Sequence, residues 1–107
     1  MYTQHMASPT TQIIIETIRQ IPNGRVTSYG RIAAMAGLAN GARQVVRILH
    51  SSAEKERLPW HRLLKKDGSI ALPRGEGFEL QRQLLEAEGV EVSPEGKVDL
   101  LRFGWWL

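Results

Sequence analysis

The chain has 107 residues, 42% of them hydrophobic and 23% charged, which suits one small globular domain. It contains no cysteine, so disulfides, thiolate nucleophiles and zinc–thiolate sites are excluded. No apolar run approaches the ~20 residues of a membrane span. The opening MYTQHMASPT lacks the pattern of a secretory signal, so we expect a cytoplasmic protein with no membrane partner. We expect residues 1–7 to form a flexible tail and residues 8–107 a single domain.

Positive charge is concentrated in the first part of the chain. Residues 1–75 carry eleven Lys or Arg against four Asp or Glu, whereas residues 76–107 carry three against seven. A one-sided basic field suits a polyanion partner such as nucleic acid. A solvated surface with uneven charge would give the same counts, and charge alone does not separate the two interpretations.

Two helices are predicted near the N-terminus. The pair Ser8-Pro9 is typical of an N-cap followed by proline in the first turn, and it predicts a helix that runs to about Gln20. Thr27 or Ser28 can cap a second helix, which Gly37 ends.

A third helix is predicted after Asn40, which can serve as its cap, with an apolar stripe formed by Val45, Ile48 and Leu49. Its other side carries basic residues at positions i, i+4 and i+7, namely Arg43, Arg47 and His50. A capped helix, a tight turn and a second helix with a basic face predict a helix-turn-helix. Two core helices with solvated arginines are an interpretation of about equal weight.

The second half of the chain predicts smaller elements. Asp67-Gly68 is typical of a turn between two short strands, residues 78–88 have helical periodicity, and residues 90–98 could form a minor hairpin. Trp105 and Trp106 either cover the core or form an exposed patch for a partner. We favour the core, since a small domain needs the buried area.

Four motifs follow one another in a characteristic order: IPNGRVTSYGRIA, GARQVVRIL, LPWHRLLKKDGSI and LLEAEGV. Together they resemble the DNA-binding domain of the O6-alkylguanine-DNA alkyltransferases, over residues 21–90. In those enzymes the third motif reads Pro-Cys-His-Arg and its cysteine accepts the alkyl group, whereas Trp60 stands here. That replacement is typical of the alkyltransferase-like proteins. The resemblance implies a mostly α, winged-helix-like helix-turn-helix domain with a small β-hairpin.

The chemistry of Trp60 argues against alkyl transfer. Accepting an alkyl group requires a soft nucleophile, and an indole N–H is only a hydrogen-bond donor. His61 therefore has nothing to activate, and we expect no enzyme activity, no cofactor and no metal. An indole does offer a flat wall against which each added CH2 of an adduct gains roughly 0.8 kcal/mol on burial. A plain core tryptophan is the alternative.

The resemblance implies that the protein binds alkylated guanine in double-stranded DNA, flips it, leaves it intact and recruits nucleotide excision repair proteins. Tyr29 would rotate the nucleotide out, and the planar guanidinium of Arg43 would fill the gap in the stack. The implied DNA-binding residues are Tyr29, Gly41, Ala42, Arg43 and Arg47, docked in the minor groove, which reads sequence poorly. A core role for Tyr29 and a phosphate contact for Arg43 remain alternatives.

The implied lesion pocket consists of Tyr29, Pro59, Trp60, His61 and Arg74. His61 and Glu88 match a pair that relays a proton from the cysteine in the enzymes, and without the cysteine we expect a structural hydrogen bond. Arg74 could lie over the flipped purine as a cation–π lid opposite Trp60, or it could be a solvated loop residue.

Weaker candidates for phosphate contacts are Arg25, Arg31, Arg47, Lys65 and Lys66. Three functions are compatible with these residues: a monomeric lesion binder, a residual enzyme using His61, and a lesion-independent helix-turn-helix regulator. A regulator of that class usually binds as a dimer across two half-sites, and no dimerisation heptads are present. We favour the lesion binder.

Overall fold

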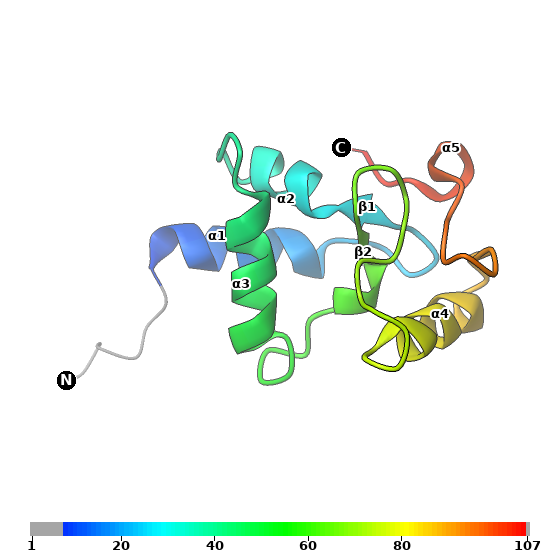
Figure 1. The fold of residues 1–107 in the computed structure, drawn as a ribbon. Coiled ribbons are helices and arrows are strands. Elements are labelled where there is room, and N and C mark those ends of the chain that lie inside the picture. The colour runs from blue at the N-terminus through cyan, green and yellow to red at the C-terminus, as the bar shows by residue number, and fades with distance from the viewer. Residues whose placement is uncertain (1–7, 107) are drawn as a thin grey trace.

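The computed structural model describes residues 8–106, so the expected tail at residues 1–7 lies outside the described part of the chain. The helices in this part are α1 Pro9–Arg19, α2 Tyr29–Met35, α3 Ala42–Ser52, α4 Phe78–Ala87 and α5 Leu100–Phe103. A 3₁₀ turn spans Trp60–Arg62, and two short strands are β1 Thr27–Ser28 and β2 Leu63–Leu64. Helices α1 to α3 gather at one end and α4 and α5 at the other, with the strands between them (Figure 1). The expectation of a mostly α domain is confirmed.

Two of the three predicted helix starts in the first half are confirmed. The Ser8 hydroxyl accepts a hydrogen bond from the Thr11 N–H at 3.1 Å, and the Ser28 hydroxyl accepts one from the Arg31 N–H at 3.1 Å. The predicted cap at Asn40 is wrong, because Gly41 is the N-cap of α3. Asn40 has a φ of 59°, so it turns the chain between α2 and α3 instead.

The strand pairing differs from the expected hairpin. Strands β1 and β2 are parallel, with Thr27 opposite Leu63 and Ser28 opposite Leu64. The Asp67-Gly68 turn is present, since the Gly68 N–H donates to the Lys65 carbonyl at 2.9 Å. Its flanks do not pair as two strands, because residues 68–70 bond across the molecule to residues 96–98. The predicted hairpin at residues 90–98 is likewise only a tight turn in the described structure.

Two apolar clusters share the small sheet. The first joins α1, α2 and α3 and includes Leu63, while the second packs around α4 and includes Leu64. Because successive strand residues point to opposite faces, these two leucines place one cluster on each side of β2. The sheet is therefore the seam between two halves of the core.

The C-terminal tryptophans take different positions. Trp105 is buried in the first cluster, and its N–H donates to the Val26 carbonyl at 2.7 Å, so the core interpretation is confirmed for it. The same interpretation is wrong for Trp106, which is 44% exposed, with the Arg31 guanidinium 4.6 Å from its ring centroid. Within residues 8–106, no helix combines the length and apolar character needed to cross a bilayer.

Candidate nucleic-acid interface

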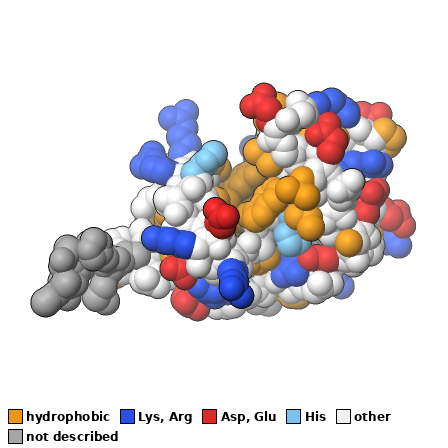
Figure 2. Space-filling model, turned by 90° about the horizontal axis from the view of Figure 1, so that it is seen from below, with side chains coloured by type: hydrophobic (Ala, Val, Ile, Leu, Met, Phe, Trp, Pro, Cys, Tyr) orange, Lys and Arg blue, Asp and Glu red, His pale blue; other side chains and the backbone are white. Residues whose placement is uncertain are grey.

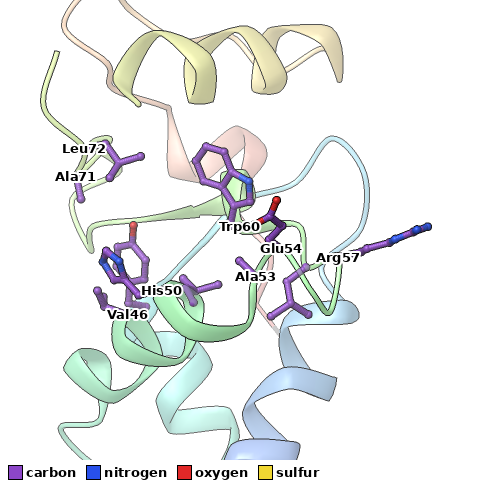
Figure 3. Close-up of a pocket in the computed structure, with 11 residues that line it drawn as sticks. Val46, His50, Ala53, Glu54, Arg57, Trp60, Ala71 and Leu72 are labelled. Carbon is purple, nitrogen blue, oxygen red and sulfur yellow. The ribbon is translucent and has the colours of Figure 1, made fainter. Parts of the chain in front are cut away.

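A cavity of about 860 Å³ opens beside α3. Figure 2 shows apolar side chains gathered around a hollow on this face of the molecule. The lining comes from the start of α2, the second half of α3, the turn that follows it, the Trp60 turn and the segment at residues 71–72. The residues involved are Tyr29, Val46, Leu49, His50, Ala53, Glu54, Arg57, Leu58, Trp60, Ala71 and Leu72 (Figure 3).

Tyr29 reaches this cavity because it is the first residue of α2, directly after the Ser28 cap. Its side chain packs partly against the first apolar cluster. Burial raises the pKa of the Tyr29 phenol, so the hydroxyl stays protonated and neutral at physiological pH. A neutral phenol can approach a phosphate without charge repulsion, as its proposed role requires.

Trp60 is held by the backbone on both sides of it. Its backbone N–H donates to the Leu58 carbonyl at 2.8 Å, directly before the 3₁₀ turn, and the Arg62 N–H donates to the Pro59 carbonyl at 3.1 Å within the turn. The buried Gln81 side chain on α4 donates from Nε2 to the carbonyls of His61 at 3.0 Å and Leu63 at 2.9 Å. These bonds fix the backbone after Trp60, so the indole has a rigid base from which to face the cavity.

Glu88, the residue that ends α4, ties this turn to the rest of the domain. Its carboxylate lies 2.6 Å from His61 Nε2, accepts from Arg62 Nη2 at 2.8 Å and accepts from the Gly24 N–H at 2.9 Å. Burial acts to raise the pKa of Glu88, but the bonds from Arg62, Gly24 and His61 outweigh it and hold the pKa at about 2. The hydrogen bond expected between His61 and Glu88 is thus present, and Arg62 joins it.

The five residues expected to share a lesion pocket are divided by the structure. Only Tyr29 and Trp60 line the large cavity. Pro59 and His61 line a smaller, more polar cavity of about 490 Å³. Three arginines, at positions 19, 57 and 62, line the same cavity. The reason is the 3₁₀ turn, which has three residues per turn and so rotates successive side chains by roughly 120°. Trp60 and His61 therefore line different cavities, although their ring centroids lie 6.1 Å apart.

Arg74 lies outside the large cavity, so the expected clamp with Trp60 is not formed in this structure. Its guanidinium sits 4.3 Å from the Phe78 ring centroid and donates from Nη2 to the Pro94 carbonyl at 3.0 Å. Its cation–π partner is therefore Phe78 at the start of α4.

Helix α3 presents its basic side as expected. Arg43 and Arg47 are exposed, while Val45 and Ile48 are buried on the opposite face. Gly41 is buried, and a Cβ there would meet the Cβ atoms of Leu38 at 2.9 Å and Ala33 at 3.0 Å. The close crossing of α2 and α3 therefore explains Gly41, whereas Ala42, one residue later, is partly exposed at the helix start.

The remaining phosphate candidates divide into two groups. Lys65 and Lys66 are exposed and form no ion pair within residues 8–106. Arg25 donates to the Arg102 carbonyl at 2.9 Å, and Arg31 lies over Trp106. Of these four side chains, the two lysines are therefore the more available for a phosphate contact.

Sequence reasoning missed most of the apolar and rim residues of the cavity. Only Val46 and Leu49 could have been found from local spacing, because each lies about one helical turn from a basic residue on α3. The turn at residues 53–58 had none, since it is polar and its shape depends on Arg57 at a φ of 53° and on the Leu58 N–H donating to the Ala53 carbonyl. Among residues 8–106, no three His, Asp or Glu side chains gather as a metal site requires.

Residues 9–90 match the family described as the 6-O-methylguanine DNA methyltransferase, DNA-binding domain. The chain belongs to this family. Within it, the domain is 45% identical to a protein named DNA base-flipping protein from Vibrio parahaemolyticus, over 86% of this chain and 91% of that one. It is 32% identical to alkyltransferase-like protein 1 of Schizosaccharomyces pombe, over 86% of this chain and 90% of that one. With Trp60 at the acceptor position, the chain is an alkyltransferase-like member of the methyltransferase family.

The fold of this alkyltransferase-like domain matches a solved structure closely. The crystal structure of S. pombe Atl1 in complex with damaged DNA containing O6-carboxymethylguanine superposes with a TM-score of 0.83 at 30% identity. The match covers 92% of this chain and 95% of that chain. The helix-turn-helix interpretation of α2 and α3 is confirmed by this shared fold.

Proposed function

We propose that this protein binds O6-alkylguanine in double-stranded DNA, rotates the damaged nucleotide out of the helix and leaves the alkyl group in place. The observation that carries the proposal is Trp60, which occupies the acceptor position and lines a cavity of about 860 Å³ together with Tyr29. That volume lies within the range of pockets that enclose small ligands, roughly 300–1,000 Å³. A flipped, alkylated base is a ligand of that kind, and relatives carry the names base-flipping and alkyltransferase-like protein.

Docking would bring α3 into the minor groove. The exposed Arg43 enters the base stack in place of the flipped nucleotide, and Arg47 contacts the phosphate backbone one turn further along the same face. Tyr29 stands at the cavity, where it crowds the phosphate of the target nucleotide. The flipped base then lies against Trp60, with its alkyl group buried and no nucleophile to receive it.

Arg74 would close the pocket only after a rearrangement. It must leave the Phe78 ring and the Pro94 carbonyl, so the loop at residues 73–77 has to move when the lesion enters. Arg74→Ala should then weaken lesion binding without affecting unmodified DNA. Unchanged affinity for O6-alkylguanine DNA would remove Arg74 from the site.

The function is tested with two labelled duplexes that differ by a single O6-methylguanine. We expect tighter binding to the lesion, an unshifted protein mass and an intact lesion afterwards. A protein mass increased by one methyl group would show alkyl transfer, and a free alkylated base would show glycosylase chemistry. Equal binding to both duplexes would exclude a lesion sensor.

The proposed downstream role rests on the proposal that the alkyl group is left in place. A protein that binds a lesion without altering it must hand the lesion on, and we propose nucleotide excision repair proteins as the partners of a monomer that acts in the cytoplasm. Incision of a lesion duplex by a reconstituted excision system, with and without this protein, tests the role.

The basic face of a helix-turn-helix favours one second candidate, a regulator that binds DNA without regard to damage. Selection of bound sequences from a pool of random duplexes distinguishes this regulator from the lesion binder. Enrichment of a palindrome would support the regulator, and no consensus is expected for the lesion binder.

A further inference from the structure

One charged side chain reaches the cavity near the indole that stands at the acceptor position. Glu54 lies in the turn directly after α3, and it lines the cavity together with Trp60. Figure 3 shows its carboxylate pointing up toward Trp60, between the indole and Ala53. Most of the other lining residues are apolar, among them Leu49, Ala53 and Leu72.

The position of Glu54 is not explained by the stability of the fold. An acidic group just beyond the C-terminal end of a helix faces the negative end of the helix dipole, where a positive charge is preferred. Its carboxylate forms no hydrogen bond or ion pair with any residue of the described range 8–106. Glu56, two residues later, is different, because it pairs with Arg19 Nη2 at 2.6 Å.

The other charged groups near the cavity do not neutralise Glu54. Arg57 also lines the cavity, but its guanidinium extends away from the indole (Figure 3). His50 lies on the other side of the cavity from Glu54 (Figure 3), and Arg74 is held on Phe78. The end of the cavity beside Trp60 therefore carries one negative charge.

We propose that Glu54 makes the pocket select among O6 adducts by charge, disfavouring anionic ones such as carboxymethyl and favouring neutral or cationic ones. The inference rests on the proposed function, in which the alkyl group of the flipped base lies against Trp60 and so meets Glu54. Docked DNA covers the exposed carboxylate and lowers the local dielectric, which strengthens its repulsion of a second negative charge. We expect about a three- to tenfold weaker affinity for an anionic adduct than for a neutral one of the same size.

The experiment compares two adducts that differ only in charge. Duplexes carrying O6-carboxymethylguanine and its amide, O6-carbamoylmethylguanine, are titrated with the wild-type protein, with O6-methylguanine and unmodified duplexes alongside. The wild type should favour the amide, and Glu54→Gln should bring the ratio of the two affinities close to one. Because the substitution also removes a negative charge beside the DNA phosphates, it should tighten binding to all four duplexes by a similar factor, so the ratio is the quantity that is compared. Glu56→Gln, which removes an equal charge two residues away and outside the cavity lining, should leave the ratio unchanged.

The two hypotheses fail in different ways. If O6-methylguanine is bound no more tightly than guanine, the proposed function is wrong. If O6-methylguanine is preferred but the amide and carboxylate bind equally, or Glu54→Gln leaves their ratio as it was, the role of Glu54 is overturned. An equal change of the ratio in Glu56→Gln would also overturn it, because the effect would then come from net charge.

Discussion

His61 Nε2 lies 2.6 Å from Glu88 Oε2, and this contact joins the turn that carries Trp60 to the end of α4. In the alkyltransferases that this chain resembles, the matching pair relays a proton from the reactive cysteine. Here Trp60 stands at the position of that cysteine, and its indole N–H is only a hydrogen-bond donor. We therefore expect the pair, together with Arg62 and Gly24, to stabilise the turn that carries Trp60.

Glu88→Gln should lower the free energy of unfolding by about 3 kcal/mol, since it leaves the Arg62 guanidinium, whose side chain is only 16% exposed, without its counter-charge. Urea unfolding measures the change. Glu86→Gln is the matched control, because Glu86 forms only a half-exposed pair with Arg82 at 3.4 Å and should cost less than about 1 kcal/mol. Equal effects of the two substitutions would show that the network contributes nothing beyond a surface pair.

The same carboxylate predicts the acid stability of the domain. The pKa of Glu88 is about 2 in the fold, against 4.5 for an ordinary glutamate, so its contribution is fully present above pH of about 4.5. It is lost progressively as the pH falls from about 4.5 toward 2, because the unfolded chain binds the proton first. Unfolding titrations between these pH values should show a steeper loss of stability for the wild type than for Glu88→Gln.

Trp60→Ala should reduce affinity for an O6-methylguanine duplex about tenfold and leave affinity for unmodified DNA nearly unchanged. Removing the indole takes away the wall of the cavity but no group of the basic α3 face. Fluorescence anisotropy of labelled duplexes measures both affinities. Trp106→Ala is the control, because Trp106 does not line the cavity; a loss of the same size there would remove the special role of Trp60.

Arg43→Lys separates the two roles open to this exposed residue. Lysine keeps the positive charge but loses the planar guanidinium that can stack between bases. If Arg43 fills the gap left by the flipped nucleotide, we expect Arg43→Lys to weaken lesion binding nearly as much as Arg43→Ala. Retained affinity in the lysine variant would identify Arg43 as a phosphate contact instead.

Arg47→Gln should weaken binding to lesion and unmodified duplexes by the same factor. It should also reduce the slope of log K against log salt concentration by about 1, as expected for the loss of one phosphate contact. Arg102→Gln serves as the control, because Arg102 pairs with Glu91 at 2.9 Å near α5, away from the α3 face. An unchanged slope in Arg47→Gln would place Arg47 outside the DNA contact.

The sequence predicted those parts of the fold that depend on interactions between residues close together in the chain. Ser8 and Ser28 cap their helices because each side-chain oxygen accepts a hydrogen bond from the unpaired N–H three residues later. Such a short-range arrangement can be recognised in the sequence. The expected hairpin failed for the opposite reason, because residues 68–70 find their partners at residues 96–98, nearly thirty positions away. Gly41 shows the same limit, since only the crossing of α2 and α3 reveals why it must be small.

The candidate site was predictable to the extent that motifs carried it. Tyr29 and Trp60 came from recognisable runs and do line one cavity, whereas His61 faces the other way because a 3₁₀ turn rotates neighbouring side chains apart. Glu54 had no signal at all. Its place depends on how the chain folds back after α3, through a left-handed Arg57, and no spacing rule describes that turn.

The cavity also lies across the seam between the two apolar clusters. Tyr29, Leu49 and Ala53 pack on the cluster of α1, α2 and α3, while Leu72 packs on the cluster of α4. A base held between them would add a link to those that already join the two halves, such as the strand pair and the bond from the Gly24 N–H to Glu88. By thermodynamic linkage, occupancy of the cavity would then stabilise both halves of the domain against unfolding.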